Sequence, residues 1–260
     1  MYNYFLQLYK YRELLLIWTE REIKIRYKQS ILGISWAILQ PLLLMIIFTV
    51  VFSLFARFPT EGIPYPIFSY VGLLPWTFLS TSFSFGSNSL VTNMNLITKV
   101  FFPREILPLG SIGAGLFDFI IATSVFIPML IFYKIHLTWL VVWIPLILTF
   151  QIILTMGITL LAAAIIVFYR DLRFIVPLGI QLWLFATPVV YSMNSIPKRY
   201  QSLLIVNPMT GIIEGYRQVL LYNQSPLNIA LVYSVVFSIF IFIAGYFIFK
   251  RMEKLFADII

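Results

Sequence analysis

Six apolar stretches, each long enough to cross a bilayer, constrain this 260-residue chain more than any other feature. A helix of about 20 apolar residues can span the hydrocarbon core because its backbone hydrogen bonds are satisfied internally. The stretches are residues 31–56, 66–85, 106–133, 139–168, 174–193 and 227–249. With 61% hydrophobic and 11% charged residues and a mean hydropathy of +0.95, the chain cannot cover a soluble core with polar surface. The sequence therefore predicts an all-α integral membrane protein with six transmembrane helices.

Lysine and arginine are distributed unevenly between the two ends of these stretches. Six precede residue 31, two lie in 86–105, two lie in 169–173 and three follow residue 249, which makes thirteen. The other side carries five: Arg57, Lys134, Lys198, Arg199 and Arg217. The positive-inside rule then predicts that both termini are cytoplasmic. Because the charges flank apolar segments, the net charge of +8 reflects orientation in a membrane, and nucleic acid is not an expected partner.

Charged and apolar residues alternate before the first apolar stretch. Glu20 and Lys24, and likewise Glu22 and Arg26, are four residues apart with the acid first, the order that favours a salt bridge along a helix. A basic amphipathic helix is attracted to membrane lipids, and especially to anionic headgroups. We therefore expect residues 1–30 to form a helix that lies on the cytoplasmic surface of the membrane.

The remaining organisation follows from the spacing of the apolar stretches. One transmembrane domain is expected over residues 1–260. After the interfacial helix it contains spans one to five (31–193), an external region (194–226), span six (227–249) and a cytoplasmic tail (250–260).

Proline and glycine break the external region into apolar pieces that are too short to cross a membrane. The breaks include Pro197 and the pair Asn207-Pro208. Half-helices that dip into the outer leaflet fit this pattern, and we interpret the region as a gate. Glu214 and Arg217, three residues apart, are predicted to form a local ion pair, and a contact within the gate is the alternative.

Several spans carry faces that combine aromatic rings with polar groups. In span two these residues are Trp76, Thr77, Ser80, Phe83 and Ser84. Span five contributes Gln181, Phe185 and Tyr191, and span one contributes Trp36 and Gln40. Aromatic rings can stack on the apolar faces of sugars while neighbouring hydroxyls exchange hydrogen bonds, and weak contacts let a polymer slide. These residues are candidates for lining a substrate channel, and the alternative is that they form interfacial belts and helix packing.

Asp118 lies near the middle of span three. An ionised carboxylate there costs at least about 2.5 kcal/mol, so it needs a partner or a proton. No other span has a central acid, lysine or histidine that would extend a proton relay. We expect a packed, hydrogen-bonded structural role for Asp118, with transport chemistry as the alternative. The sequence shows no metal-binding or catalytic constellation, so no residue is assigned to either role.

Two predicted cytoplasmic surfaces are candidates for a contact through which another protein moves the transmembrane helices. Leu90, Met94, Ile97 and Phe101 recur at helical spacing and predict a short amphipathic helix, which Pro103 ends. The interfacial helix is the second surface, and the loop at 169–173 offers a further contact. The charged residues of these surfaces are Glu20, Arg21, Lys24, Lys99, Arg104, Arg170, Asp171 and Arg173. The alternative is that these charges only set the topology.

A series of motifs occurs in an order that resembles one known family. They are Arg26 to Trp36 with Pro41, Asn95 to Pro108, Tyr169 to Arg173, Pro188 to Tyr191, Asn207-Pro208 and Tyr216-Arg217. Over nearly its whole length the chain resembles the membrane subunits of ABC exporters that move O-antigen, capsule or teichoic-acid polysaccharides, most closely the O-antigen type.

The resemblance implies a homodimer of six-span subunits in the bacterial inner membrane, joined to two cytosolic ATPase subunits. It implies that the ATPase subunits bind ATP and Mg, so this chain needs no cofactor of its own. ATP hydrolysis would drive a lipid-diphosphate-linked polysaccharide outward through a channel between the protomers. It also assigns residues 90–101 as the coupling helix. Because the chain has no Gly-x-x-x-x-Gly-Lys-Ser/Thr loop, the ATPase is expected to be a separate chain.

Four other functions compete with this one. The substrate of such an exporter could be teichoic acid, capsule or a small amphipathic drug. A membrane-embedded glycosyl- or acyltransferase should show convergent acids or histidines at a cleft, and none are found in the sequence. A proton-coupled flippase needs a chain of ionisable groups within the membrane, and Asp118 stands alone among the spans.

Overall fold

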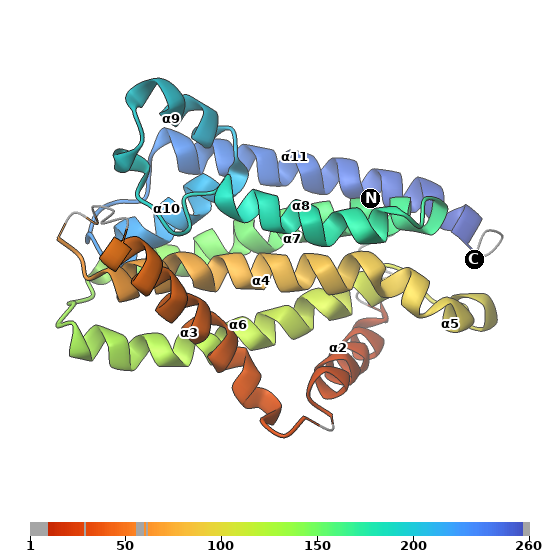
Figure 1. The fold of residues 1–260 in the computed structure, drawn as a ribbon. Coiled ribbons are helices and arrows are strands. Elements are labelled where there is room, and N and C mark those ends of the chain that lie inside the picture. The colour runs from red at the N-terminus through yellow and green to blue at the C-terminus, as the bar shows by residue number, and fades with distance from the viewer. Residues whose placement is uncertain (1–9, 29, 56–59, 61, 257–260) are drawn as a thin grey trace.

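The structure is a computed structural model that describes residues 10–28, 30–55, 60 and 62–256. Within these residues the secondary structure is helical and contains no strand. Long helices lie side by side along most of the length of the molecule, with α9 and α10 at one end and α5 and the end of α11 at the other (Figure 1). The all-α prediction is confirmed for the described residues.

The helices follow the apolar stretches of the sequence. The main ones are α2 (Arg12–Tyr27), α3 (Trp36–Phe48), α4 (Tyr65–Thr92), α5 (Met94–Lys99), α6 (Ile106–Phe132), α7 (Trp143–Phe168), α8 (Leu172–Phe185), α9 (Lys198–Ile205), α10 (Pro208–Leu220) and α11 (Ile229–Met252). Short 3-10 or π turns are η1 (Gly33–Ser35), η2 (Thr49–Phe55), η3 (Trp139–Val142), η4 (Met193–Ser195) and η5 (Glu253–Leu255).

Four helical segments of the described chain are long and apolar enough to cross a membrane: Gly33–Ser53, Ile106–Phe132, Trp139–Phe168 and Ile229–Leu255. They coincide with predicted spans one, three, four and six. Helix α4 has 28 residues, which corresponds to about 42 Å at 1.5 Å per residue, but its hydroxyl-rich face makes it less apolar. Helix α8 has 14 residues, about 21 Å, which is less than the hydrocarbon thickness.

The predicted extent of span five, residues 174–193, is wrong at its C-terminal end. Helix α8 stops at Phe185, and the backbone then forms turns as far as Ser192. Pro188 cannot donate a helical hydrogen bond, which favours the break. The carbonyl groups of this turn are bound by side chains from other helices, as described below, so the break is held by tertiary contacts.

Helix α4 forms the centre of the larger core. It packs against α3, α6, α7, α8 and α10, and Ile67, Phe68, Tyr70, Leu73 and Leu79 are almost completely buried on it. The burial of this helix explains how it can carry serine and threonine: its polar residues bond to its own carbonyl groups or face protein. A lipid-facing helix could not hide so many hydroxyls.

A second, smaller core lies at the end of the molecule that carries α5 and the end of α11 (Figure 1). Trp18 from α2, Ile97 from α5, Phe102, Phe249 from α11 and Phe256 are buried together there. Elements far apart in the sequence are therefore joined into one rigid end, and α2 packs directly on α6. Within the segment 1–30, for which an interfacial helix is predicted, a helix runs from Arg12 to Tyr27, while residues 1–9 and 29 lie outside the described chain.

Two glycines let α7 and α11 approach closely. A Cβ atom on Gly245 would lie 2.3 Å from the Gly157 carbonyl oxygen, and one on Gly157 would lie 2.6 Å from the Phe242 backbone nitrogen. Both obstacles are backbone atoms, which cannot move independently of their helices. Small residues at such crossings are typical of membrane helices, because close approach maximises van der Waals contact.

We predict that Gly245→Ala separates α7 from α11 and destabilises the protein by about 1–3 kcal/mol, the usual cost of overpacking. Thermal unfolding of the purified protein in detergent measures this loss. Gly179→Ala on α8 is the matched control, because a Cβ atom there meets nothing within 4 Å. Equal melting temperatures for the two variants would show that the crossing is not tightly packed.

Candidate functional site

An ion pair joins the end of α2 to the middle of α6. Arg26 Nη1 donates to Asp118 Oδ2 at 2.6 Å, and Arg26 Nη2 donates to the Ser111 carbonyl oxygen at 3.1 Å. The Tyr27 hydroxyl donates to the other oxygen of Asp118. Both carboxylate oxygens therefore have donors, which confirms the hydrogen-bonded placement expected for Asp118. Burial and then the hydrogen bond to Asp118 raise the pKa of the Tyr27 phenol, so Tyr27 remains a donor at neutral pH.

The predicted pairing of Glu22 with Arg26 is wrong. Arg26 turns inward to Asp118, whereas the Glu22 carboxylate lies 3.8 Å from Arg21 Nη1. A buried carboxylate within a span gains more from a cation than an acid near the helix surface does, because less solvent screens the pair. The other predicted pair is confirmed: Lys24 and Glu20 form a salt bridge on the exposed side of α2.

A cavity of about 400 Å³ opens beside this ion pair, between α2, α3, α4 and α6. Its polar lining includes Arg26, Tyr27, Gln40, Thr77, Thr81 and Asp118. Its apolar lining includes Trp36, Phe78, Phe85 and Phe119. Ligand sites commonly combine an apolar wall with a few converging polar groups, and volumes of about 300–1,000 Å³ are typical of them.

The cavity brings together three of the predicted channel residues, Trp36, Gln40 and Thr77, from two different spans. Trp36 and Gln40 are exposed, and Thr77 is partly buried. Trp76 differs, because it is only 4% exposed and packs edge-on against Trp183 of α8 at 5.8 Å. Helix packing, the alternative interpretation, therefore describes Trp76 within this chain.

The other predicted channel residues lie on α4, on α8 or in the turn after α8, and they do not line this cavity. Ser80, Phe83 and Ser84 are partly buried on α4, and the Ser80 hydroxyl donates to the Thr77 carbonyl oxygen at 3.2 Å. Gln181 and Phe185 are exposed on α8. The Tyr191 hydroxyl donates to the Phe185 carbonyl oxygen at 3.2 Å and so closes the turn after α8.

The predicted helix from Leu90 to Phe101 is wrong at both ends. Leu90 belongs to α4 and is completely buried, and the separate helix α5 contains only Met94–Lys99. Asn93 interrupts the helix with φ −112° and ψ 33°, and its side-chain amide donates to the Ser89 carbonyl oxygen, which favours an end at that point.

Helix α5 presents one buried and one exposed side. Ile97 is only 2% exposed and anchors the helix in the smaller core, while Met94 is partly buried. Lys99 is exposed, and Phe101 follows the helix with 86% of its surface exposed. An aromatic ring that projects this far from the end of a rigid element is a candidate contact for another protein.

Charged groups tie the segment after α5 to the end of α11. Lys250 Nζ lies 2.7 Å from Glu105 Oε2 and 2.9 Å from Glu253 Oε2. The other Glu253 oxygen accepts a hydrogen bond from the Arg104 backbone nitrogen at 3.0 Å. Burial and the nearby Glu253 raise the pKa of the Glu105 carboxyl, whereas Lys250 opposes the rise. A displacement of the segment after α5 would therefore be transmitted to the end of α11 through these contacts.

The remaining predicted coupling residues lie on the surface of the same end. Arg21 stacks over the Trp18 ring at 4.2 Å and donates to the Asn93 side chain at 3.3 Å, which links α2 to the end of α4. Arg170 and Asp171 are exposed in the loop between α7 and α8, and Arg173 is exposed in the first turn of α8.

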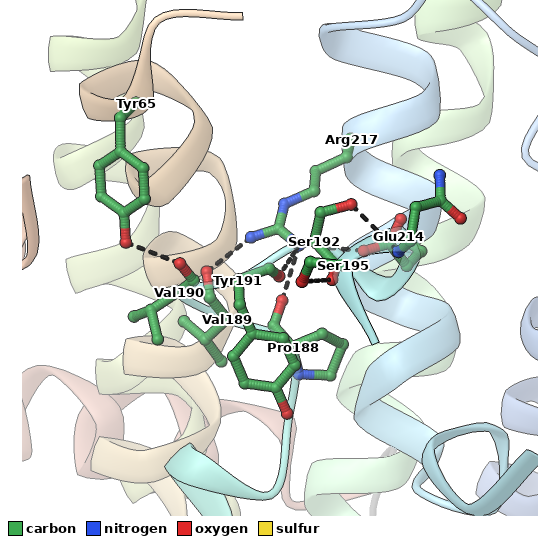
Figure 2. A network of polar contacts seen from close by, with 10 residues as sticks. Tyr65, Pro188, Val189, Val190, Tyr191, Ser192, Ser195, Glu214 and Arg217 are labelled. Carbon is green, nitrogen blue, oxygen red and sulfur yellow. Dashed lines mark hydrogen bonds and ion pairs between the residues drawn. The ribbon is translucent and has the colours of Figure 1, made fainter. Parts of the chain in front are cut away.

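At the opposite end, Arg217 of α10 is completely buried and binds the turn that follows α8 (Figure 2). Its guanidinium donates to the carbonyl oxygens of Pro188, Val189 and Tyr191, with the first at 2.6 Å and the last at 3.3 Å. The Tyr65 hydroxyl donates to the intervening Val190 carbonyl oxygen at 2.6 Å. Four consecutive carbonyl groups in the turn after α8, those of residues 188–191, thus accept hydrogen bonds from the side chains of Arg217 and Tyr65.

The charge of Arg217 is balanced by Glu214, whose Oε1 lies 3.0 Å from Arg217 Nη1, so the predicted ion pair is confirmed. The guanidinium also lies 3.8 Å above the Phe68 ring of α4. Gly72 makes room for this arrangement, because a Cβ atom there would lie 2.6 Å from the Val189 carbonyl oxygen.

The broken region itself contains two short helices, as the proline and glycine breaks predict. Pro197 is the N-cap of α9, and Pro208 is the first residue of α10. Asn207 caps α10 by accepting from the Met209 backbone nitrogen at 3.1 Å, and its Oδ1 also accepts from Trp183 Nε1 at 3.0 Å. This asparagine therefore fixes the start of α10 against α8.

The sequence of this chain is similar to those of known proteins. The sequence matches the ABC-2 type transporter family over residues 13–221. This chain belongs to that family. The match to the ABC-2 type transporter family runs from α2 to the end of α10, so it covers the cavity, helix α5 and the Arg217 network together.

Relatives of this ABC-2 family member include two O-antigen export system permease proteins RfbA. The protein from Myxococcus xanthus is 34% identical over 255 residues, which cover 97% of each chain. One from Klebsiella pneumoniae is 31% identical over 252 residues, which cover 95% of each chain. The polysialic acid transport protein KpsM of Escherichia coli is 24% identical over 248 residues, 90% of this chain and 91% of its own.

Sequence analysis missed two of the polar clusters. The partner of Asp118 is Arg26, 92 residues away, and the partner of Glu105 is Lys250, 145 residues away. A signal existed for the first pair, because a single acid within the spans requires a cation and the end of α2 is rich in them. Local spacing carries no comparable signal for the second.

We predict that Arg217→Lys loosens the turn after α8, because one ammonium cannot bind three carbonyl groups and Glu214 with the geometry of a guanidinium. Hydrogen exchange of peptides spanning residues 186–195 should become faster by about tenfold or more, while the global fold is retained. Arg199→Lys is the control, because Arg199 only stacks on Tyr200 at the surface. Unchanged protection in Arg217→Lys would refute the clamping role of Arg217.

Proposed function

We propose that this chain is the membrane subunit of an ATP-driven ABC exporter that moves lipid-diphosphate-linked polysaccharide, of the O-antigen kind, out of the cytoplasm. The observation that carries this proposal is the similarity to O-antigen permeases over nearly the whole of both chains. The more distant similarity to a polysialic acid transporter supports a carbohydrate polymer in general. The chain itself is a transport subunit and not an enzyme.

The energy for transport comes, in this proposal, from a separate ATPase that binds ATP and Mg. The 260-residue sequence contains no Gly-x-x-x-x-Gly-Lys-Ser/Thr loop, which is the loop that cradles nucleotide phosphates in such ATPases. Two ATPase subunits would serve two copies of this chain. ATP binding can shift the permease between states only if the ATPase contacts those states differently.

The assembly we propose is a homodimer of six-span subunits in the bacterial inner membrane, with both termini in the cytoplasm. Thirteen of the 18 basic residues lie on the side that carries the termini, which supports this orientation. Helix α4 is long enough to be the second span, and α8 with the following turn would be the fifth. The exposed apolar side chains of α3 and α8, such as Ile47 and Leu182, suit contact with lipid or a second copy.

The cytoplasmic end would receive force from the ATPase. Helix α5 and the exposed Phe101 form the proposed coupling element, and the Lys250 network offers a path from it to α11. The surface of α2 and the loop at 169–173 would be the other contacts. The turn clamped by Arg217, together with α9 and α10, would form the external gate at the opposite end.

A small amphipathic drug is the second candidate substrate for the same architecture. The two candidates differ in a measurable way, because a lipid-linked glycan should stimulate ATP hydrolysis by the reconstituted complex and a panel of hydrophobic drugs should not. Stimulation by the drugs alone would contradict the polysaccharide proposal.

We predict that Phe101→Ala reduces co-purification of the ATPase and export of lipid-linked glycan by about tenfold or more, because it removes an aromatic anchor from the contact. Co-expression with the ATPase, followed by glycan export in proteoliposomes, measures both effects. Phe132→Ala is the matched control, because Phe132 is also highly exposed. Phe132 is the last residue of α6, whereas Phe101 lies before the first residue of that helix. Normal coupling in the Phe101 variant would remove α5 from the ATPase contact.

A further inference from the structure

Arg26 lines the cavity between α2, α3, α4 and α6, and its hydrogen bonds are made within the protein. The Arg26 side chain is only 9% exposed, and its two terminal nitrogens are bound to Asp118 and Ser111. Its third nitrogen, Nε, is buried without a hydrogen-bond partner. Because Nε has almost no accessible surface, it does not face the open cavity, and Arg26 offers a ligand no free donor.

The charge of the lining argues against an anionic ligand. Arg26 is the only cation among the described lining residues, and Glu22 and Asp118 are both carboxylates. One positive and two negative groups give the lining a negative net formal charge. The Arg26 charge is already neutralised by Asp118 at 2.6 Å. A phosphate or diphosphate would have to be desolvated beside two carboxylates without a free cation, which is unfavourable. The cavity therefore suits a neutral ligand.

The remaining lining residues suit a ring that carries hydroxyl groups. Trp36 lines the cavity with an aromatic side chain, and the residue is 46% exposed, while Gln40 offers both a donor and an acceptor. The Thr77 and Thr81 hydroxyls donate to the carbonyl oxygens of Leu74 and Thr77, at 3.0 and 2.7 Å. Each threonine oxygen can still accept a hydrogen bond from a ligand hydroxyl.

We propose that this cavity binds one neutral sugar ring of the exported glycan, with Trp36 stacked on the ring and Gln40, Thr77 and Thr81 hydrogen-bonded to its hydroxyl groups. The proposal rests on the proposed function and adds that this chain holds the glycan through a sugar and not through the diphosphate. Because each protomer contains such a cavity, two copies would offer two sugar sites near the junction of α2 and α6.

A thiol placed in the cavity tests this assignment. The chain contains no cysteine, so Thr81→Cys introduces a single reactive group whose labelling rate reports access. The complex with its ATPase is studied in nanodiscs with three probes of equal chain length, octyl β-glucoside, octyl phosphate and octanol, all below micellar concentrations. Ser124→Cys is the control, because Ser124 is exposed on α6 and outside the lining.

We expect octyl glucoside to slow labelling of the Thr81→Cys thiol by about fivefold, while octyl phosphate and octanol have little effect. Adding Trp36→Ala should remove most of this protection, and the Ser124→Cys thiol should be unaffected throughout. Protection by octyl phosphate equal to or greater than that by the glucoside would overturn the proposal in favour of an anion site. Equal protection by all three probes, or by none, would also overturn it.

Glycan export by the same complex is measured in parallel, so that the two proposals are tested separately. Export of lipid-linked glycan without any protection by the glucoside would reject the sugar site and leave the proposed function intact. Protection by the glucoside without glycan export would retain the sugar site and reject the proposed function.

Discussion

The ion pair between Arg26 and Asp118 joins segments that are 92 residues apart and holds α2 against α6. An ionised carboxylate within a membrane span is costly on its own, and so is a buried guanidinium. Each group therefore requires the other, and Tyr27 and the Ser111 carbonyl oxygen complete their hydrogen bonding except at Arg26 Nε. A pair of this kind specifies one position of the helix along its partner more strictly than apolar packing does, because apolar contacts tolerate sliding.

Other features of the molecule depend on that position. With α2 fixed, the chain turns through η1 into α3, and the space left between α2, α3, α4 and α6 is the cavity. Trp18 is buried against α6 in the same arrangement, so the helix that would lie at the membrane surface is also part of the smaller core. At the opposite end, Arg217 has a similar role: one buried cation organises the turn after α8 by binding its carbonyl groups.

The parts of the fold that depend on local sequence were predictable. Long apolar stretches gave the positions of α3, α6, α7 and α11, and proline and glycine marked the break before α9 and α10. The early end of α8 was missed although Pro188 follows it closely, and the turn after it could not be predicted because its carbonyl groups are bound by Arg217 and Tyr65, which lie elsewhere in the chain. The division of α4 from α5 at Asn93 was missed for a different reason: the apolar spacing continues through the break, and the helix ends through the backbone conformation and the side-chain hydrogen bond of Asn93.

Only some of the residues that line the cavity were among the predicted channel residues. Aromatic and hydroxyl residues were expected to lie together, and Trp36, Gln40 and Thr77 do so. Trp76 belongs to the same sequence pattern but is buried against Trp183. Its burial was missed because helical spacing alone does not determine which residues of a face pack against another helix. Arg26 and Tyr27 were missing from the predicted site, since their place in it depends on a partner distant in sequence.

A double-mutant cycle on Arg26 and Asp118 tests most directly whether this ion pair organises the protein. The variants are Arg26→Gln, Asp118→Asn and the double variant, and the measurement is the free energy of unfolding of each in the same detergent. Each single variant leaves one buried charge unpaired and should lose about 3–5 kcal/mol, whereas the double variant should recover much of that loss. Losses that add in the double variant would contradict the account, because they would show that the two residues do not stabilise each other.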